Sequence, residues 1–175
     1  DGPAFLALTR QKVPALDRTT LASADGLERG GYVLAESDGG EPEAILVASG
    51  SEVALALEAR GRLQKQGVPT RVVSLPSWFL FERQDAEYRH TVLPPSVGIR
   101  VSIEAGSTAG WSRWVGSEGA SVGLDRFGAS APHTDLYREF GITAEAAAET
   151  LERTVVLLGD GLDPVLLDEA AIRDA

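Results

Sequence analysis

The sequence predicts an α/β domain in which helices cover a layered sheet. Short apolar runs such as 44–48 and 70–75 alternate along the chain with longer amphipathic segments, as expected when buried strands are connected by surface helices. The chain has 175 residues, of which 43% are hydrophobic and 24% charged, so it can form one well-packed core with an appendage. We expect the main domain to begin near Gly30.

The composition argues against several classes of partner. The formal net charge is −10 and no stretch clusters Lys and Arg, so we expect no nucleic-acid binding, which depends on basic side chains facing phosphates. No apolar run approaches the roughly 20 residues of a membrane span, so we expect no membrane partner. Cysteine is absent, which excludes cysteine nucleophiles and thiolate metal sites within this sequence and fits a reducing compartment. We therefore expect a cytoplasmic protein.

The domain is expected to begin with two strands, 31–35 and 44–48. They are joined through Asp38-Gly39-Gly40, a glycine-rich turn that favours an antiparallel hairpin. Ser49-Gly50-Ser51-Glu52 then matches the capping-box pattern, in which the first and last side chains satisfy the free amides at a helix start. This pattern predicts a helix that ends at Gly67.

The rest of the domain continues the alternation of strands and helices. A strand at 70–75 completes a strand–helix–strand unit. The elements expected beyond it are a turn at 78–81, helices at 86–93, 111–115, 134–140 and 143–158, and strands at 98–103 and 120–123. Thr143 is the expected N-cap of the last helix.

A candidate crevice lies where two of these strands end. Glu104 follows the strand 98–103, and Ser49 and Ser51 follow the strand 44–48. Open α/β sheets bind ligands at the carboxyl ends of their strands, and a helix start can hold an anion. The capping box explains the two serines equally well, however, and Glu104 could instead accept hydrogen bonds from loop amides. Both interpretations stay open at this stage.

Other residues with catalytic chemistry do not form a complete site. His90 lies in a charged helical segment and is expected on the surface, and His133 lies at a helix start with no nucleophile nearby in the sequence. Trp111 and Trp114 are three residues apart, so core packing or a subunit contact is expected for them. The residues alone therefore predict no catalytic residue and no metal ligand.

Seven short motifs follow one another along the chain in an order and spacing that one enzyme family shares. They are Leu8-Thr9-Arg10-Gln11, Gly30-Gly31-Tyr32-Val33-Leu34, Ala48-Ser49-Gly50-Ser51-Glu52-Val53, Arg71-Val72-Val73-Ser74-Leu75-Pro76-Ser77, Phe81-Glu82-Arg83-Gln84-Asp85, Glu104-Ala105-Gly106 and Phe127-Gly128-Ala129-Ser130-Ala131-Pro132. Together they resemble the C-terminal domain of the transketolases, over residues 2–158. Trp78-Phe79-Leu80 departs from the family, which has more polar residues there.

The resemblance implies a three-layer α/β/α domain over residues 30–158, with a five-stranded mixed sheet and one antiparallel strand. Residues 1–12 resemble the last strand of the preceding pyrimidine-binding domain, residues 13–29 a linker, and residues 159–175 a tail beyond the family's usual end. The chain contains no Met, which also favours excision from a larger polypeptide.

The family transfers a two-carbon ketol unit from a ketose phosphate to an aldose phosphate, as a homodimer that uses thiamine diphosphate and a divalent cation, Mg²⁺ or Ca²⁺. The family's cofactor and metal ligands belong to earlier domains, so the resemblance implies none bound here and an inactive fragment. One family site falls inside the chain, because Arg10 matches the arginine that contacts the sugar phosphate. A planar guanidinium suits that contact, since it donates two parallel hydrogen bonds to phosphate oxygens.

Two alternatives remain at this stage. The chain could be the equivalent module of another thiamine enzyme, such as deoxyxylulose phosphate synthase or a dehydrogenase β subunit, although Thr9-Arg10-Gln11 and the motif at 127–132 favour a transketolase. It could also be an autonomous ligand-binding or regulatory module that uses the crevice near Ser49, Ser51 and Glu104.

Overall fold

The described part of the chain folds around one mixed sheet. The computed structural model describes residues 3 and 5–159, and within these residues five strands pair in the order β1-β3-β2-β4-β5. The strands are β1 (Tyr32–Ala35), β2 (Ala44–Ala48), β3 (Thr70–Ser74), β4 (Arg100–Ile103) and β5 (Ala120–Val122). Only β1 runs antiparallel to its neighbour, and the other described pairs are parallel. The predicted five-stranded mixed sheet is confirmed.

The predicted hairpin between the first two strands is wrong. β3 lies between β1 and β2, with Val33 opposite Val73 on one side and Leu46 opposite Val72 on the other. The reason lies in β2, which is buried along its whole length and therefore needs neighbours and helices on all sides. The less buried β1 takes the edge of the sheet instead.

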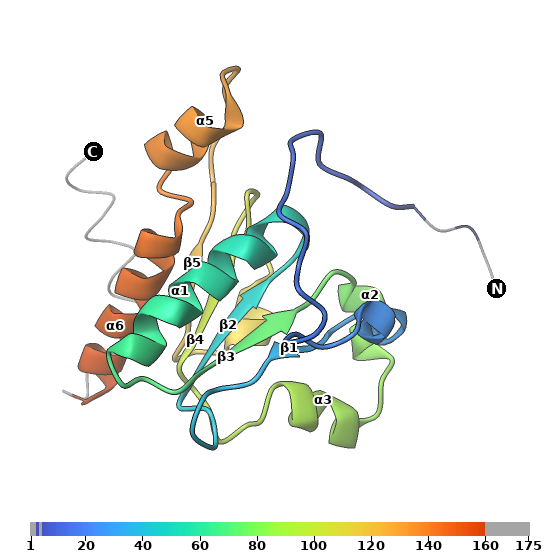
Figure 1. Cartoon of the computed structure of the whole chain (residues 1–175), viewed down its shortest axis with the longest axis vertical. Helices are drawn as coiled ribbons and strands as arrows, with labels where there is room; N and C mark the ends of the chain where they lie inside the picture. Colours follow the sequence, from blue (N-terminus) through green and yellow to red (C-terminus); the bar gives the residue numbers. More distant parts are fainter. Residues whose placement is uncertain (1–2, 4, 160–175) are drawn as a thin grey trace.

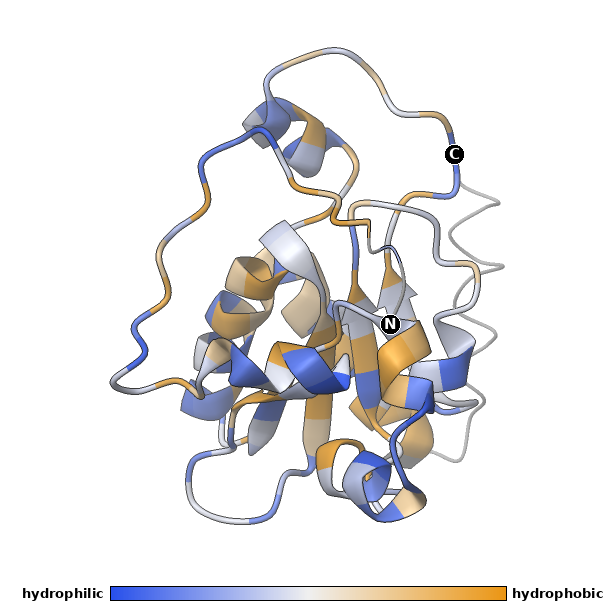
Figure 2. Ribbon diagram, turned by 90° about the vertical axis from the view of Figure 1, so that its right-hand side faces the viewer, coloured by the Kyte–Doolittle hydropathy of each residue, from blue (hydrophilic) through white to orange (hydrophobic). Residues whose placement is uncertain are grey.

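Helices cover both faces of the sheet, which gives the predicted three layers (Figure 1). α1 (Val53–Lys65) and α6 (Ala144–Gly159) lie on one face, whereas α2 (Trp78–Glu82), α3 (Ala86–Val92) and α4 (Ser112–Val115) lie on the other. Figure 2 shows hydrophobic strands in the middle and helices with alternating hydrophobic and hydrophilic residues around them. The remaining helix, α5 (His133–Glu139), stands outside the layers.

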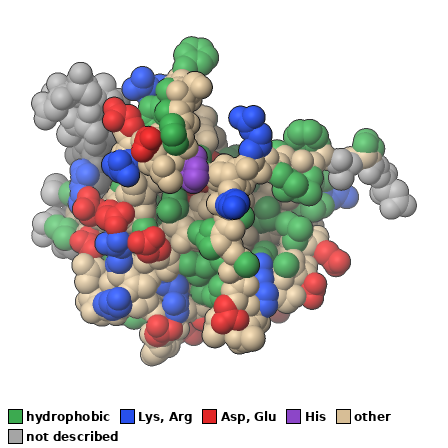
Figure 3. Space-filling model, turned by 45° about the horizontal axis from the view of Figure 1, so that its top comes forward, with side chains coloured by type: hydrophobic (Ala, Val, Ile, Leu, Met, Phe, Trp, Pro, Cys, Tyr) green, Lys and Arg blue, Asp and Glu red, His purple; other side chains and the backbone are tan. Residues whose placement is uncertain are grey.

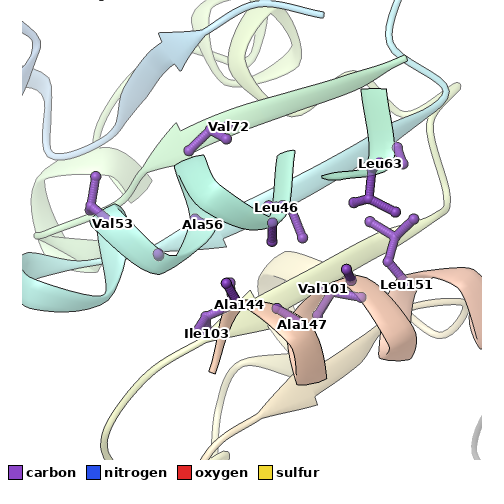
Figure 4. Close-up of a cluster of buried hydrophobic side chains, with 14 of the residues drawn as sticks. Leu46, Val53, Ala56, Leu63, Val72, Val101, Ile103, Ala144, Ala147 and Leu151 are labelled. Atoms are coloured by element: carbon purple, nitrogen blue, oxygen red, sulfur yellow. The ribbon is translucent and has the colours of Figure 1, made fainter. Parts of the chain in front are cut away.

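Two hydrophobic cores flank the central strand. Leu46 of β2 points into the core beneath α1 and α6, which also contains Leu63 and Leu151 (Figure 4). Its neighbours Ile45 and Val47 point into the opposite core, so the side chains alternate as a strand requires. That second core gathers Phe81, Val92, Trp111 and Trp114 with the half-buried Trp78, whose ring centroid lies 5.0 Å from that of Trp111. The prediction of core packing for the two tryptophans is confirmed.

Most predicted helices and strands appear within a few residues of their expected bounds. The exception is 78–81, a predicted turn, which begins α2 because the Ser77 hydroxyl accepts a hydrogen bond from the Leu80 amide and caps the helix. Thr143 caps α6 as predicted, since its Oγ1 accepts a hydrogen bond of 3.1 Å from the Ala146 amide. None of the described helices has the length and hydropathy that crossing a bilayer requires.

The linker segment 13–29 packs on the domain. Leu16 and Leu21 contact the core beneath α1, and the Ala22 amide donates to the Leu34 carbonyl at 3.0 Å. A short 3₁₀ helix, η1 (Ala24–Arg29), then leads to β1. The segment is therefore part of the domain's surface and not a loose connection.

The described residues before the linker form no strand. The side chains of Phe5, Leu6 and Leu8 are exposed, Phe5 to 93%, and Figure 3 shows hydrophobic side chains along this N-terminal arm. Their assignment to the strand of a preceding domain stays a prediction. Apart from Gly159, the predicted tail at 159–175 lies outside the described residues.

Candidate functional site

The candidate crevice lies at the point where the order of the sheet reverses. The chain passes from β2 through α1 to β3 on one side and later returns to β4 on the other side. The carboxyl ends of β2 and β4 therefore form the switch point at which open α/β sheets bind ligands. Ser49 and Glu104 follow these two strands, and the Ser49 hydroxyl donates a hydrogen bond of 2.7 Å to Glu104 Oε2. The sequence prediction thus named two residues that the fold brings together.

The predicted capping box is wrong. A 3₁₀ turn, η2 (Gly50–Glu52), precedes α1, and the Ser49 side chain makes no capping hydrogen bond. Its hydroxyl donates to Glu104 instead. The Glu52 side chain is turned inward and only 3% of the residue is exposed, because its carboxylate accepts hydrogen bonds from Ser51 Oγ at 2.7 Å and Tyr137 Oη at 2.6 Å. Ser49 and Glu52, the first and last residues of the capping-box pattern, therefore make tertiary contacts instead of capping the helix.

A second polar contact joins the N-terminal segment to this cluster. Gln11 Nε2 donates to Tyr137 Oη at 3.3 Å, and the Gln11 side chain also contacts that of Thr9. Burial raises the pKa of Tyr137, and its hydrogen bond to the Glu52 carboxylate adds to the rise. The tyrosine therefore stays protonated at neutral pH and acts as a donor to Glu52.

Sequence reasoning missed Glu52, Tyr137 and Gln11 as members of one cluster. Glu52 looked like a capping residue, and Tyr137 is separated from it by 85 positions along the chain. Gln11 belonged to a recognised motif, but nothing in the sequence indicated its partner. Ser51, which was predicted to line the crevice, donates to Glu52 and lines a groove beside α5.

Glu104 is the electrostatically perturbed residue at the crevice. Burial raises the pKa of its carboxyl group, the hydrogen bond from Ser49 opposes the rise, and the negative charge of Glu52 adds to it. The folded domain therefore binds a proton at Glu104 more readily than the unfolded chain does. The ionised Glu104 therefore lowers the free energy of unfolding at neutral pH, and this loss disappears as the pH falls and the carboxyl group is protonated.

Glu104→Gln is expected to stabilise the domain at neutral pH by a small amount. An amide cannot ionise, and its oxygen can still accept the Ser49 hydroxyl. The folded-state pKa is raised, so the stability of the parent falls as the pH rises from the ordinary glutamate value through the folded value, whereas that of the variant does not. Urea unfolding at about pH 4 and about pH 7 measures the difference, which should appear only at the higher pH.

The exposed Glu149 on α6 provides the matched control for this measurement. Glu149→Gln changes the net charge by the same amount without a buried carboxyl group. If both substitutions changed stability equally at the higher pH, the burial of Glu104 would not be the cause.

The other predicted residues lie apart from the switch point or at its margin. Arg10 precedes Gln11 and is exposed, as are His90 and His133. A groove of about 580 Å³ runs between the linker, α1 and α5 and is lined in part by Gln11, Ser51 and Tyr137. Figure 3 shows this face of the molecule, where hydrophobic and charged side chains are interspersed.

The crevice does not fit thiamine diphosphate or its cation. Its ionisable side chains, Glu52 and Glu104, are carboxyl groups that would repel a diphosphate. Within the described residues, no three or more His, Cys, Asp or Glu side chains gather closely enough to hold a metal ion.

Comparison with known proteins decides between the alternatives. Residues 30–143 match the family model of the transketolase-like TK C-terminal domain. The chain belongs to this family. The resemblance read from the seven motifs is therefore confirmed for the domain that follows the linker.

Curated transketolases extend the similarity over most of the chain. This chain is 50% identical over 154 residues to a chloroplastic transketolase of Craterostigma plantagineum. The alignment covers 87% of this chain and 29% of the relative. The chain is 45% identical over 159 residues to the transketolase of Geobacillus stearothermophilus, covering 91% of this chain and 23% of the relative. The chain thus spans less than a third of the length of either.

Solved transketolases share the fold. A mutant transketolase of Pichia stipitis matches with a TM-score of 0.76 and 38% identity over 88% of this chain and 21% of its own. The transketolase of Leishmania mexicana matches with a TM-score of 0.69 and 40% identity, over 76% of this chain and 19% of its own. The α/β/α architecture of this chain is therefore that of transketolases.

The prediction of a cytoplasmic location is contradicted by these comparisons. The similar transketolases of Craterostigma plantagineum, Spinacia oleracea and Solanum tuberosum are chloroplastic proteins. The prediction rested on the lack of cysteine, and that feature fits any reducing compartment.

Proposed function

We propose that this chain is the C-terminal part of a transketolase, which transfers a two-carbon ketol unit from a ketose phosphate to an aldose phosphate. The family match and the identity of up to about half of the aligned residues support this role. Structures of the Pichia stipitis transketolase contain sedoheptulose 7-phosphate or xylulose 5-phosphate, which are sugar phosphates of the proposed kind.

The proposed contribution of this chain is a contact between Arg10 and the substrate phosphate. Arg10 is exposed and directly precedes Gln11, which is hydrogen-bonded to the domain. A guanidinium can donate two hydrogen bonds to phosphate oxygens, and these are among the stronger polar interactions in proteins. The exposed position of Arg10 next to the attached Gln11 is the observation on which the proposal rests.

Thiamine diphosphate and its cation would act outside the described residues in the proposed enzyme, which we expect to be a homodimer as in the family. The carboxyl groups of the crevice would repel a diphosphate, and the described residues contain no group of three or more His, Cys, Asp or Glu side chains that could hold the cation. In this arrangement the C-terminal domain positions substrate and supplies packing surface, while other domains provide the cofactor chemistry.

A role as an independent ligand-binding module has weaker support. The polar groups at the switch point already satisfy one another, since Ser49 donates to Glu104 while Ser51 and Tyr137 donate to Glu52. A thermal-shift screen with nucleotides and sugar phosphates would reveal such a function, because a ligand that binds the folded state raises its Tm.

Arg10→Ala is expected to raise KM for phosphorylated substrates roughly 10- to 100-fold, the loss expected for hydrogen bonds between charged groups. The effect on unphosphorylated ketoses should be small, because they lack the group that Arg10 contacts. Steady-state kinetics can be measured in the Geobacillus stearothermophilus transketolase after its matching region has been replaced by this chain, since the two are 45% identical.

Lys12→Ala is the matched control, because it removes an exposed cation two positions away. The chain alone, supplied with thiamine diphosphate and Mg²⁺, serves as the negative control and should show no turnover. Equal effects of Arg10→Ala on phosphorylated and unphosphorylated substrates would rule out the phosphate contact.

A further inference from the structure

Tyr137 connects the segment that carries Arg10 to the body of the domain. Its hydroxyl donates to Glu52 Oε1 at 2.6 Å and accepts from Gln11 Nε2 at 3.3 Å. Glu52 belongs to η2, Tyr137 to α5, and Gln11 is the residue after Arg10. Three parts of the chain that are distant in sequence therefore meet at one hydroxyl group.

The Glu52 end of this connection is firmly held. Glu52 lies four residues after the end of β2, it is buried, and its carboxylate also accepts the Ser51 hydroxyl at 2.7 Å. The short hydrogen bond from Tyr137 to a carboxylate is of the stronger, charge-assisted kind. Because the tyrosine proton is used toward Glu52, the oxygen lone pairs remain available to the Gln11 amide.

The N-terminal end has few other contacts with the domain. Phe5, Leu6 and Leu8 are exposed, and the first linker side chain that packs on the core is Leu16. Among the described residues before Leu16, the hydrogen bond that joins this segment to the domain is that of Gln11. Arg10 thus directly precedes the residue that makes this polar attachment.

We propose that Tyr137 is a positioning residue for Arg10, an inference that rests on the proposed phosphate contact. By holding Gln11, Tyr137 restricts the backbone next to Arg10 before substrate arrives. The segment is then already ordered when the domain has folded. The entropy lost on ordering it therefore does not reduce the affinity for substrate. Tyr137 itself does not touch the substrate in this arrangement.

Tyr137→Phe tests the attachment in the chain itself. Phenylalanine keeps the ring packed on the domain and removes only the hydroxyl group. The backbone amides of residues 9–13 donate no hydrogen bond within the described part of the chain, so the readout is their mobility: NMR order parameters over this segment are expected to fall to the flexible range, below about 0.6. Gln11→Ala should give the same fall in the order parameters, and the double variant should add little to either single change.

The same variants test positioning in the replaced Geobacillus stearothermophilus transketolase. Tyr137→Phe is expected to raise KM for the phosphorylated ketose about fivefold, while kcat and KM for an unphosphorylated ketose stay unchanged. Tyr88→Phe is the control, because the Tyr88 hydroxyl also donates a partly buried hydrogen bond, of 2.8 Å to the Gly31 carbonyl, but has no hydrogen bond to the N-terminal segment.

The outcomes separate the two proposals. If Arg10→Ala raises KM for phosphorylated substrates while Tyr137→Phe does not, the positioning role is overturned and the phosphate contact stands. Unchanged order parameters of residues 9–13 in Tyr137→Phe also overturn the positioning role, whatever the kinetics. If Arg10→Ala has no phosphate-specific effect, the phosphate contact fails and the positioning role fails with it, even where the order parameters show that Tyr137 holds the segment.

Discussion

Replacing Gly30 by alanine is expected to destabilise the domain by about 3 to 5 kcal/mol, the sum of an unfavourable backbone conformation and a steric clash. Gly30 has a φ of +82°, which residues with a side chain rarely adopt. A Cβ atom there would lie 2.4 Å from the backbone nitrogen of Phe81 and 2.4 Å from the carbonyl oxygen of Ser77. Neither backbone atom can move freely, because Phe81 is buried in the core.

Gly39→Ala separates the two contributions to this loss. Gly39 has a similar φ of +89°, but a Cβ atom there would meet nothing within 4 Å, so only the backbone cost of about 1 to 2 kcal/mol applies. Thermal unfolding should show a Tm that is lower by roughly 10 °C for Gly30→Ala and by a few degrees for Gly39→Ala. Equal shifts in the two variants would show that the contact with α2 is unimportant.

The position of Gly30 explains why this glycine matters for the site. Its carbonyl accepts a hydrogen bond of 2.9 Å from the Ser77 amide, and its own amide donates to the Leu27 carbonyl at 2.9 Å. Gly30 therefore fixes the junction at which the linker leaves the sheet. The linker ends at this junction, and Gln11 lies in the segment that precedes the linker.

The sequence predicted the central strand well because its residues are uniformly apolar. β2 is apolar throughout, and such a run bounded by turn residues is typical of a buried parallel strand. The pairing of β1 was missed because local turn residues favour a hairpin, whereas pairing depends on which strand needs burial on both sides. That requirement arises from the whole layer and is not visible in residues 31–48.

The candidate site could be predicted only in part. Ser49 and Glu104 follow from the rule that ligands bind at the carboxyl ends of strands. Glu52 was assigned to a cap because its spacing from Ser49 is that of a capping box, and the sequence does not show that a tyrosine on α5 offers its carboxylate a better partner. Polar contacts between distant segments have no local pattern, so they were found only in the fold.

Leu151→Ala is the second large effect, with an expected loss of about 3 to 5 kcal/mol. Leu151 is 0% exposed and lies on α6 opposite Leu63 and Val101, as Figure 4 shows. Truncation to alanine leaves a cavity between α6, α1 and β4 that these well-packed neighbours cannot fill. Urea unfolding of the chain measures the loss as a lower midpoint with an unchanged m value.

Val156→Ala on the same helix is the control, because Val156 is 61% exposed and should cost less than about 1 kcal/mol. A comparable loss in both variants would mean that the burial of Leu151 is not the cause, because alanine has a higher helix propensity than either residue it replaces. Leu151 packs on the core and not on the linker, so Leu151→Ala should leave KM for phosphorylated substrates unchanged at temperatures where the enzyme stays folded. Tyr137→Phe should do the reverse, raising that KM with a smaller loss of stability, because it acts on the attachment of Gln11.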